Sequence, residues 1–317
     1  MLYIQMNFRF GLLLSSILTL YILSSCGSGA KESQSETPKT ADFESIKGIT
    51  FHEIRRQFEN GLSFDTIGFQ QEPEWILKFL RNDRVEIFSP QEGKMMSFHL
   101  HHDHDNYYNF GREWFAVKLL SKDSIILQRL EVKSLRIKND ERSNVFMTFY
   151  SEDYMANKLK TAKGELQKPN KADTIFVKER IKLANDNPLD SNYLFAARKP
   201  VQLSAKSKAI KVNTYSSFDP LTKSSAYDYL YPEFKIEISN AYKKFNYAFR
   251  VIVDVNKNIK VYDFPSYEED TKENRHKVLQ GICDIYLRNM LNIIPGSTLG
   301  IPHASLITLY VKGEAKP

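Results

Sequence analysis

The segment WILKFLRNDRVEIF, residues 75–88, has the pattern of two β-strands joined by a tight turn. In its first half Trp75, Leu77 and Phe79 alternate with the other side chains, and in its second half apolar residues alternate with charged ones. Side chains two apart on a strand point to the same face of a sheet. The polar RND between the two halves supplies the turn, so we expect a β-hairpin with one buried face.

Strand patterns of this kind continue through residues 46–160. Further examples are MMSFHL, WFAVKLL, SIILQRLEV and NVFMTFY. Short strands separated by polar turns over roughly 100 residues are typical of an antiparallel barrel or sandwich. Their order, together with Trp75, resembles the small lipocalin-like domains of exported bacterial lipoproteins, and this resemblance implies a barrel that holds a small ligand. The sequence therefore predicts a β-rich N-terminal domain over residues 46–160.

We interpret residues 161–225 as an irregular connecting region that contains one helix. The helical pattern lies in DTIFVKERIKLANDNP, where Asp173 is a candidate N-cap and Pro188 follows the end. One face of this helix would carry Phe176, Arg180, Ile181 and Ala184. The later segment KPVQLSAKSKAIKVNTY has an extended pattern. A domain boundary is expected within residues 160–230.

The last part of the chain predicts a hairpin, a helix and a strand. FRVIVDV alternates, NKN turns the chain, and IKVYDF returns. Asp270 and Glu273 then form the pattern of a capping box at a helix start. The apolar face of this helix would carry Leu279, Cys283, Tyr286 and Met290. SLITLYV alternates as a final strand, so we expect a small α+β domain over residues 226–317.

This order of elements resembles the C-terminal domain of TonB and its homologues. The matching positions are Tyr231 with its proline, Asp254, Pro295, Gly296, Gly300 and Pro302. The chain departs from the family where Ile293 and Ile294 replace a tryptophan. The resemblance implies a domain that binds partner proteins by adding a strand to an exposed sheet edge. Since the chain lacks the membrane-spanning anchor and proline-rich spacer of an energy transducer, the resemblance implies a docking module.

The first residues have the features of an export signal. Arg9 precedes an apolar run over residues 10–23, which is shorter than the roughly 20 residues of a membrane span. The run ends in Leu-Ser-Ser-Cys, which resembles the lipobox of bacterial lipoproteins. The resemblance implies a signal peptide over residues 1–25 and lipid attachment at Cys26. The alternative is a plain signal peptide with an incidental cysteine.

Residues 26–45 are small and polar, and we interpret them as a flexible tether behind the lipid. The whole chain carries a formal net charge of +6. Its lysines are spread along the sequence, which favours solubility and attraction to anionic lipid headgroups over nucleic-acid binding. The expected location is the cell envelope, anchored by lipid at the outer membrane. The sequence does not decide between its periplasmic and its external face.

The stretch FHLHHDHDNYY, residues 98–108, concentrates histidines in the pattern H-x-H-x-D-H. Metallo-β-lactamase-type hydrolases present zinc ligands in this form, and the resemblance would make His99, His101, Asp103 and His104 ligands. Against a hydrolase, the segment upstream lacks an Asp-x-Gly strand end, and DNYY in place of small residues follows the last histidine. Only His276 and His303 remain downstream to complete two metal sites.

A weaker metal site is the second interpretation of this stretch. On a strand, His99 and His101 share a face, and His104 with Asp103 or Asp105 would complete a shallow site for a divalent ion. The third interpretation is a hairpin whose solvent face and tip are rich in histidine. Met96, Phe98 and Leu100 would then face the core.

No other motif in the chain indicates catalysis or a cofactor. The sequence contains no phosphate-binding glycine loop, no G-x-S-x-G and no H-E-x-x-H. Cys283 lies on the apolar face of the last predicted helix, which favours a core residue over a nucleophile. The sequence predicts a non-catalytic envelope lipoprotein that binds a protein partner at the outer membrane. The alternatives are a small-ligand or metal-binding lipocalin-like protein and, third, a metallo-hydrolase.

Overall fold

The computed structural model describes residues 40–81, 83–134, 136–138, 143–215, 226–265 and 269–315. The expected signal peptide, Cys26 and most of the expected tether lie outside these ranges. Within them, no helix has the length and apolar character needed to cross a membrane. The folded part begins earlier than residue 46, because the 3₁₀ turn η1 (Phe43–Ile46) packs its Phe43 ring 4.6 Å from Phe79.

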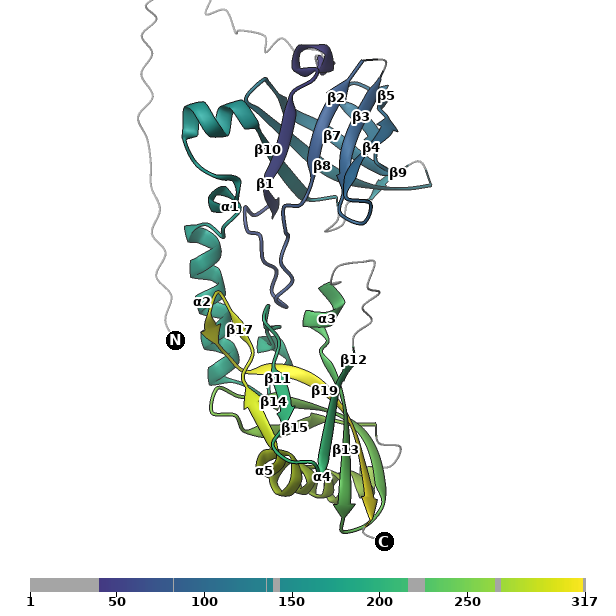
Figure 1. Ribbon diagram of the computed structural model, residues 1–317, viewed down its shortest axis with the longest axis vertical. Coiled ribbons are helices and arrows are strands. Elements are labelled where there is room, and N and C mark those ends of the chain that lie inside the picture. Colours follow the sequence, from purple (N-terminus) through teal and green to yellow (C-terminus); the bar gives the residue numbers. More distant parts are fainter. Residues whose placement is uncertain are drawn as a thin grey trace, which may run out of the picture. The chain divides into compact units, whose positions relative to one another are not determined.

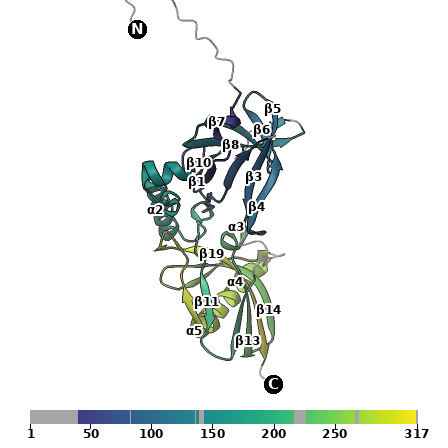
Figure 2. The same ribbon diagram turned by 45° about the horizontal axis from the view of Figure 1, so that its top comes forward.

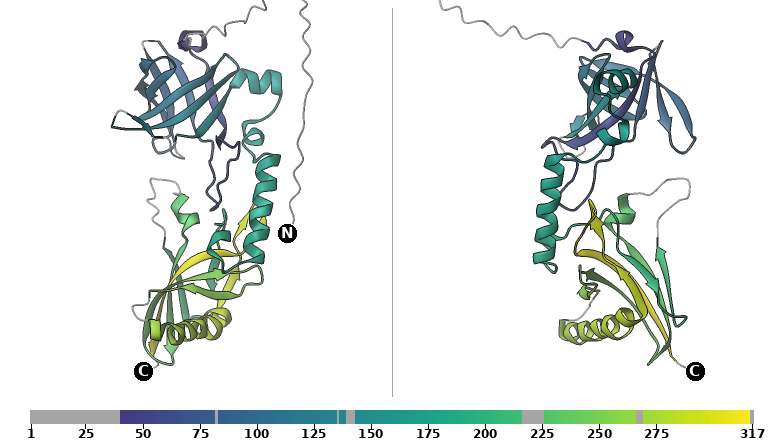
Figure 3. Two further views of the ribbon diagram at one scale, coloured as in Figure 1. Left: turned by 180° about the vertical axis from the view of Figure 1, so that it is seen from behind. Right: turned by 60° about the vertical axis from the view of Figure 1, so that its left-hand side comes forward.

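The N-terminal half forms a nearly closed, antiparallel, barrel-like sheet, which we call the N-terminal sheet. Its strands are β1 (Thr50–Phe58), β2 (Ile76–Leu80), β3 (Arg84–Ser89), β4 (Lys94–His99), β5 (His101–His104), β6 (Tyr107–Phe110), β7 (Glu113–Leu120), β8 (Ser124–Lys133), β9 (Arg136–Lys138) and β10 (Val145–Ser151). They pair in the order β4-β3-β2-β1-β10-β8-β7-β6-β5, with β9 on β8. Figure 3 shows these strands wrapping around a common interior.

The predicted hairpin at residues 75–88 is confirmed as β2 paired with β3. Leu77 lies opposite Ile87 and Phe79 lies opposite Val85, and all four side chains are buried. Their alternation with exposed or half-buried neighbours follows from the two-residue period of a strand. The hairpin therefore contributes one continuous apolar face to the interior.

The two ends of this sheet are consecutive in the sequence. β4 ends at His99, β5 begins at His101, and the buried Leu100 between them donates its N–H to the carbonyl of Asp83 at 2.7 Å. The chain therefore changes its strand partner at Leu100, because β4 before it pairs with β3 and β5 after it pairs with β6. This change of partner brings the sheet close to a closed barrel, in which few edge groups stay unpaired.

Aromatic side chains fill much of the interior of the N-terminal sheet. The Phe79 and Phe110 rings meet edge to face at 6.1 Å between centroids, and Phe110 stacks on Phe115 at 4.5 Å. Each of these three side chains is at most 1% exposed. A fully buried phenylalanine contributes about 1.5–3 kcal/mol, so this cluster is a major source of the stability of this half.

The middle of the chain is helical before it becomes extended. It contains the π-helical turn η2 (Tyr154–Leu159), α1 (Lys163–Leu166), α2 (Lys171–Asp186) and the 3₁₀ turn η3 (Ser191–Tyr193). The helix expected here is present, with Ile181 and Ala184 buried as predicted. Its N-cap is Asn170 and not Asp173 as expected. Asp173 is instead the third residue of a capping box, in which Asn170 and Asp173 each accept the other's backbone N–H.

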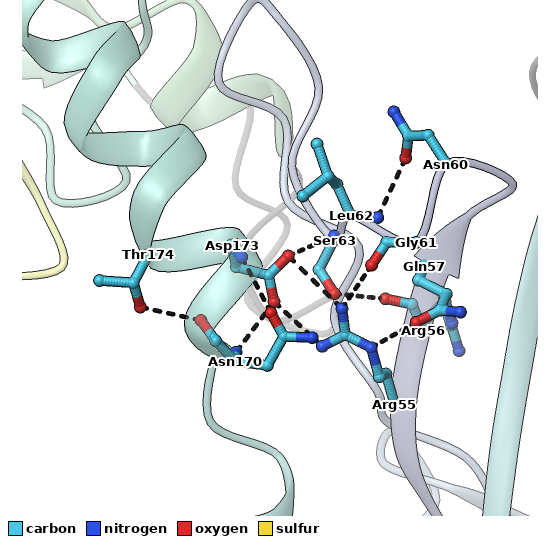
Figure 4. A network of polar contacts seen from close by, with 10 residues as sticks. All are labelled: Arg55, Arg56, Gln57, Asn60, Gly61, Leu62, Ser63, Asn170, Asp173 and Thr174. Atoms are coloured by element: carbon cyan, nitrogen blue, oxygen red, sulfur yellow. Dashed lines mark hydrogen bonds and ion pairs between the residues drawn. The ribbon is translucent and has the colours of Figure 1, made fainter.

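Asp173 also fastens α2 to β1, as Figure 4 shows. Its carboxylate, which is fully buried, accepts hydrogen bonds from the Arg55 guanidinium at 3.0 Å and from the Ser63 N–H at 2.8 Å. Arg55 also donates to the carbonyl of Gly61 at 2.7 Å. A buried carboxylate needs several donors to offset its lost hydration. This network supplies them, so we interpret it as a structural clamp.

The C-terminal elements form a second sheet, which we call the C-terminal sheet. Its strands pair in the order β12 (Ile210–Tyr215), β13 (Glu233–Ala241), β19 (Ser305–Ala315), β14 (Phe245–Val253) and β15 (Ile259–Asp263). The β13–β19 pair is parallel and the other pairs are antiparallel. The remaining elements are β11 (Gln202–Ala205), α3 (Ala226–Leu230), α4 (Glu269–Ile282), the π-helical turn η4 (Cys283–Leu287), α5 (Arg288–Met290), β16 (Leu291–Ile294), β17 (Ser297–Thr298) and β18 (Ile301–Pro302).

The expected hairpin, helix and final strand are all present in this part (Figure 1). The helix begins at Glu269, so Asp270 lies inside it and is not the N-cap that the sequence suggested. Leu279 and Cys283 of its predicted apolar face are buried, and Tyr286 and Met290 are half-buried against the same core. This helix covers one face of the C-terminal sheet, where Phe249, Val251, Leu309 and Val311 are among the buried strand residues (Figure 2).

β11 and β12 precede the expected domain start at residue 226 but pair with C-terminal strands. β11 pairs with β16, and β12 pairs with β13. The extended pattern of KPVQLSAKSKAIKVNTY therefore corresponds to two real strands. Their partners lie between 18 residues further along the chain, where Tyr215 pairs with Glu233, and 92 residues further, where Gln202 pairs with Ile294.

Candidate partner-binding edge

The histidine stretch lies on the outside of the N-terminal sheet, at the point where its two ends meet. His99 and His101 are exposed neighbours whose ring centroids are 6.3 Å apart, as their positions on one strand face suggested. The His99 Nδ1 is 3.0 Å from the carbonyl oxygen of Asp83. Leu100 is buried and Phe98 is half-buried against the core, which agrees with the predicted inward face.

The structure gives the other histidines of the stretch separate partners. The His104 Nδ1 lies 2.5 Å from the Asp103 carboxylate, and its ring stacks on Tyr107 at 4.8 Å. His102 packs against Tyr108 and its Nε2 lies 3.0 Å from the carbonyl oxygen of Asp105. Among the described residues, no three histidine, cysteine, aspartate or glutamate side chains are grouped to hold one metal ion. His99 and His101 are therefore brought together, whereas His104 is engaged by Asp103.

Cys283 and His303 are buried in the C-terminal part, and burial shifts the pKa of each. Burial raises the pKa of the Cys283 thiol to about 12, which keeps it protonated and unreactive at neutral pH. Burial lowers the pKa of His303. The Nδ1–H of His303 donates to the Ala304 carbonyl at 3.0 Å, and the Thr298 hydroxyl donates to its Nε2 at 3.0 Å. Both groups are fully packed, so we assign them structural roles.

One outer edge of the C-terminal sheet is closed by a side chain. β15 pairs only with β14 in the described sheet, and its backbone on the outer side is met by Gln280 of α4. The Val261 N–H donates to the Gln280 Oε1 at 2.9 Å, and the Gln280 Nε2 donates to the Ile259 carbonyl at 3.0 Å. An amide side chain carries both a donor and an acceptor, so it satisfies an edge strand as another strand would.

The opposite edge, β12, stays open within the described residues. The Ser239 N–H donates to the Ala209 carbonyl at 2.8 Å, so these two opposite residues form a hydrogen-bonded pair. Hydrogen-bonded and non-bonded pairs alternate along an antiparallel ladder, so the pairs of Val212 and Thr214 with β13 are non-bonded. The backbone groups of Val212 and Thr214 therefore point away from β13. No described residue donates to or accepts from them. The β12–β13 pairing has no bulge, and an edge strand without bulge or proline is a template for another strand.

A pocket of about 420 Å³ adjoins this edge. Thr214 of β12 and Leu203 of β11 both line it, together with Val201, Tyr229 and Phe234. Tyr229 and Phe234 are buried. The side chain of Thr214 lies in register with Phe234 across the β12–β13 pair. The pocket is thus next to the inner face of β12, where side chains of an added strand would alternate inward.

The far wall of the pocket is held by Arg198. Its guanidinium lies over the Tyr229 ring at 4.3 Å and donates to the Glu72 carboxylate at 2.5 Å. The Arg198 backbone N–H donates to the Thr298 hydroxyl oxygen, the same group that bonds His303. The Gln70 N–H donates to the Tyr229 hydroxyl at 2.9 Å. These contacts fix the wall in place, so the pocket is a preformed feature of the fold.

Sequence reasoning missed Val212, Thr214 and Gln280 as edge residues. Strand pairing over long separations decides which strand lies at an edge, and no local pattern shows it. Nothing in the local sequence around Gln280 shows that its side chain reaches β15. Neither a protein-family model nor a curated protein matches this chain.

Proposed function

We propose that the chain is a non-catalytic envelope lipoprotein that binds a protein partner by accepting a strand at β12. The observation that carries this proposal is the contrast between the two edges of the C-terminal sheet. Gln280 satisfies β15, whereas Val212 and Thr214 present donors and acceptors on β12 that no described residue satisfies. Main-chain hydrogen bonds supply affinity in strand addition, and pockets beside the edge supply selectivity.

The resemblance to the TonB C-terminal domain supports the same function. The final strand β19 returns beside the β14–β15 hairpin, with α4 on one face, in the order that the resemblance implies. β13 lies against the other side of β19, so the exposed edge is moved outward to β12. We propose that this part is a TonB-like docking domain extended by the β12–β13 pair.

Anchoring by lipid at Cys26 would hold this docking domain at the outer membrane. Two or three acyl chains, at about 0.8 kcal/mol for each buried methylene, bind a membrane almost permanently. Cys283 offers no alternative attachment site, because its thiol is buried and stays protonated. Replacement of Cys26 by serine should move the chain from the membrane fraction to the soluble fraction. It should also abolish labelling by an alkyne fatty acid, and retention of the label would contradict lipidation at this residue.

A photo-crosslinking residue tests the edge itself. A benzophenone amino acid in place of Thr214, in the full chain within envelope membranes, should give one discrete crosslinked partner. The same amino acid in place of Lys260, which is exposed on the closed-edge strand β15, is the matched control and should give none. Addition of Val212→Pro, which removes an outward N–H, should abolish the Thr214 product. Equal products at the two positions, or a product that survives Val212→Pro, would exclude strand addition at β12.

A further inference from the structure

The segment that contains the open edge is strongly one-sided in charge. Residues 191–215 contain Arg198, Lys199, Lys206, Lys208 and Lys211 and no aspartate or glutamate. Arg198 is engaged by Glu72, and the Lys206 Nζ donates to the Arg288 carbonyl. No carboxylate of the described residues forms an ion pair with Lys199, Lys208 or Lys211. Glu237 lies opposite Lys211 across the β12–β13 pair, so the edge presents an excess of lysines over acidic groups. These lysines lie beside main-chain groups that no described residue satisfies.

The two faces of β12 would meet different side chains of an added strand. Ile210 and Val212 turn inward toward the core, and Thr214 lines the pocket on the same face. Lys211 and Tyr215 lie on the exposed face, where the Lys235 Nζ lies over the Tyr215 ring at 4.6 Å. Side chains of an added strand would alternate between these faces. Those on the inner face would enter the pocket, and those on the outer face would pass Lys211.

We propose that the partner supplies an extended segment in which acidic residues alternate with large apolar ones. The acidic side chains would lie along Lys208 and Lys211, and one apolar side chain would fill the pocket beside Thr214. This inference rests on the proposed strand addition and names the chemistry of the partner. The same lysines oppose pairing of β12 with another copy of itself or with a basic segment, because like charges facing each other across a pair are destabilising.

Synthetic peptides test the chemistry directly on the full chain in detergent. The first probe is a fluorescent octapeptide of alternating glutamate and valine. The second alternates lysine and valine, and the third has four glutamates followed by four valines. We expect the alternating acidic peptide to bind about tenfold more tightly than either of the others in fluorescence anisotropy. Its affinity should fall as the salt concentration rises from about 50 to about 300 mM, because the Debye length shortens from roughly 14 Å to roughly 6 Å.

Charge reversal identifies the residues that select the peptide by its charge. In the double variant Lys208→Glu with Lys211→Glu, the preference should invert toward the lysine peptide. The matched control is Lys257→Glu with Lys260→Glu, two exposed lysines at the closed edge, and it should leave the preference unchanged. Circular dichroism melts of both double variants, which alter only exposed side chains, verify that they are folded.

Each outcome decides the inference separately from the proposed function. Equal binding of acidic and basic peptides, an unchanged preference after reversal at Lys208 and Lys211, or no binding of any peptide up to about 1 mM would overturn the acidic assignment. If binding is independent of charge but lost in Val212→Pro, strand addition stands and only the partner chemistry is wrong. Loss of the Thr214 crosslink contrast would instead overturn strand addition itself.

Discussion

The two sheets of this chain treat their edges in opposite ways. The N-terminal sheet brings its two end strands together at Leu100, whereas the C-terminal sheet ends in the open strand β12. Closure of a sheet pairs the main-chain groups of its edge strands within the fold, so another strand finds few free groups to pair with. An open edge keeps donors and acceptors available to a partner. We propose that the first sheet serves stability and the second serves recognition of a partner.

The largest expected effect tests the bracing of the N-terminal sheet by α2. Asp173→Ala removes the carboxylate that binds Arg55 and leaves that half-buried cation without its partner. Loss of one member of a buried pair costs about 3–5 kcal/mol in free energy of unfolding. Urea denaturation measures it. Asp186→Ala in the same helix breaks only the exposed pair with Lys182 and should cost less than about 1 kcal/mol. Similar losses in both variants would refute the clamp.

The second prediction tests the packed side of the C-terminal sheet. Gly313 lies opposite Phe245, and a Cβ added there would come within 2.5 Å of the phenyl ring. Gly313→Ala should therefore lower the free energy of unfolding by about 1–3 kcal/mol. In Gly281→Ala the added Cβ meets no neighbour within 4 Å, and the helix α4 should gain about 0.5–1 kcal/mol. Thermal unfolding of both variants gives the sign, and stabilisation by Gly313→Ala would contradict the close packing.

A smaller effect comes from the buried His303 behind the pocket wall. Because burial lowers its pKa below the ordinary 6.5, the unfolded chain binds more protons than the folded chain below that pH. The free energy of unfolding should fall as pH drops below about 6.5, by at most about 1.4 kcal/mol for each pH unit. Denaturation between pH 5 and 7.5 measures the slope. His303→Gln should flatten it, and an identical slope in that variant would assign the pH dependence to other groups.

The smallest predicted change in stability concerns the open edge. Since the Val212 N–H points away from β13, Val212→Pro should cost less than about 1 kcal/mol. Ile236→Pro, in the central strand β13, removes a ladder hydrogen bond to β19 and should be far more destructive. Chemical denaturation of the two proline variants compares an edge strand with a central one. Equal losses would mean that β12 is not an edge.

Local pattern was enough to predict many of the individual elements. The alternation around Leu77 and Phe79 gave the hairpin, and the spacing of Leu279 and Cys283 gave the buried face of α4. The N-cap of α2 was predicted at Asp173, but it is Asn170, which precedes Asp173 by the three residues of a capping box. A short polar side chain at either position fits a helix start, and only the geometry decides between them.

Features that depend on distant pairing could not be predicted. Leu100 continues the alternation of apolar and polar residues around it, yet the chain changes its strand partner there from β3 to β6. The edge position of β12 follows from β13 taking the place beside β19, where Glu233 pairs with Thr308, 75 residues later in sequence. For the histidines, alternation predicted that His99 and His101 are neighbours. The partners of His104 depend on the turn that follows and were not apparent.

The connections of the N-terminal sheet also determine the order in which its strands can pair. Most neighbours along it are joined by short turns, but Phe51 of β1 pairs with Ser151 of β10, 100 residues later. Closing so long a loop is entropically costly and slow. As the chain is made, β1 must wait with one side unpaired until β10 emerges. During that interval β1 exposes main-chain groups with which another chain can pair, and chains truncated before residue 145 would keep these groups exposed.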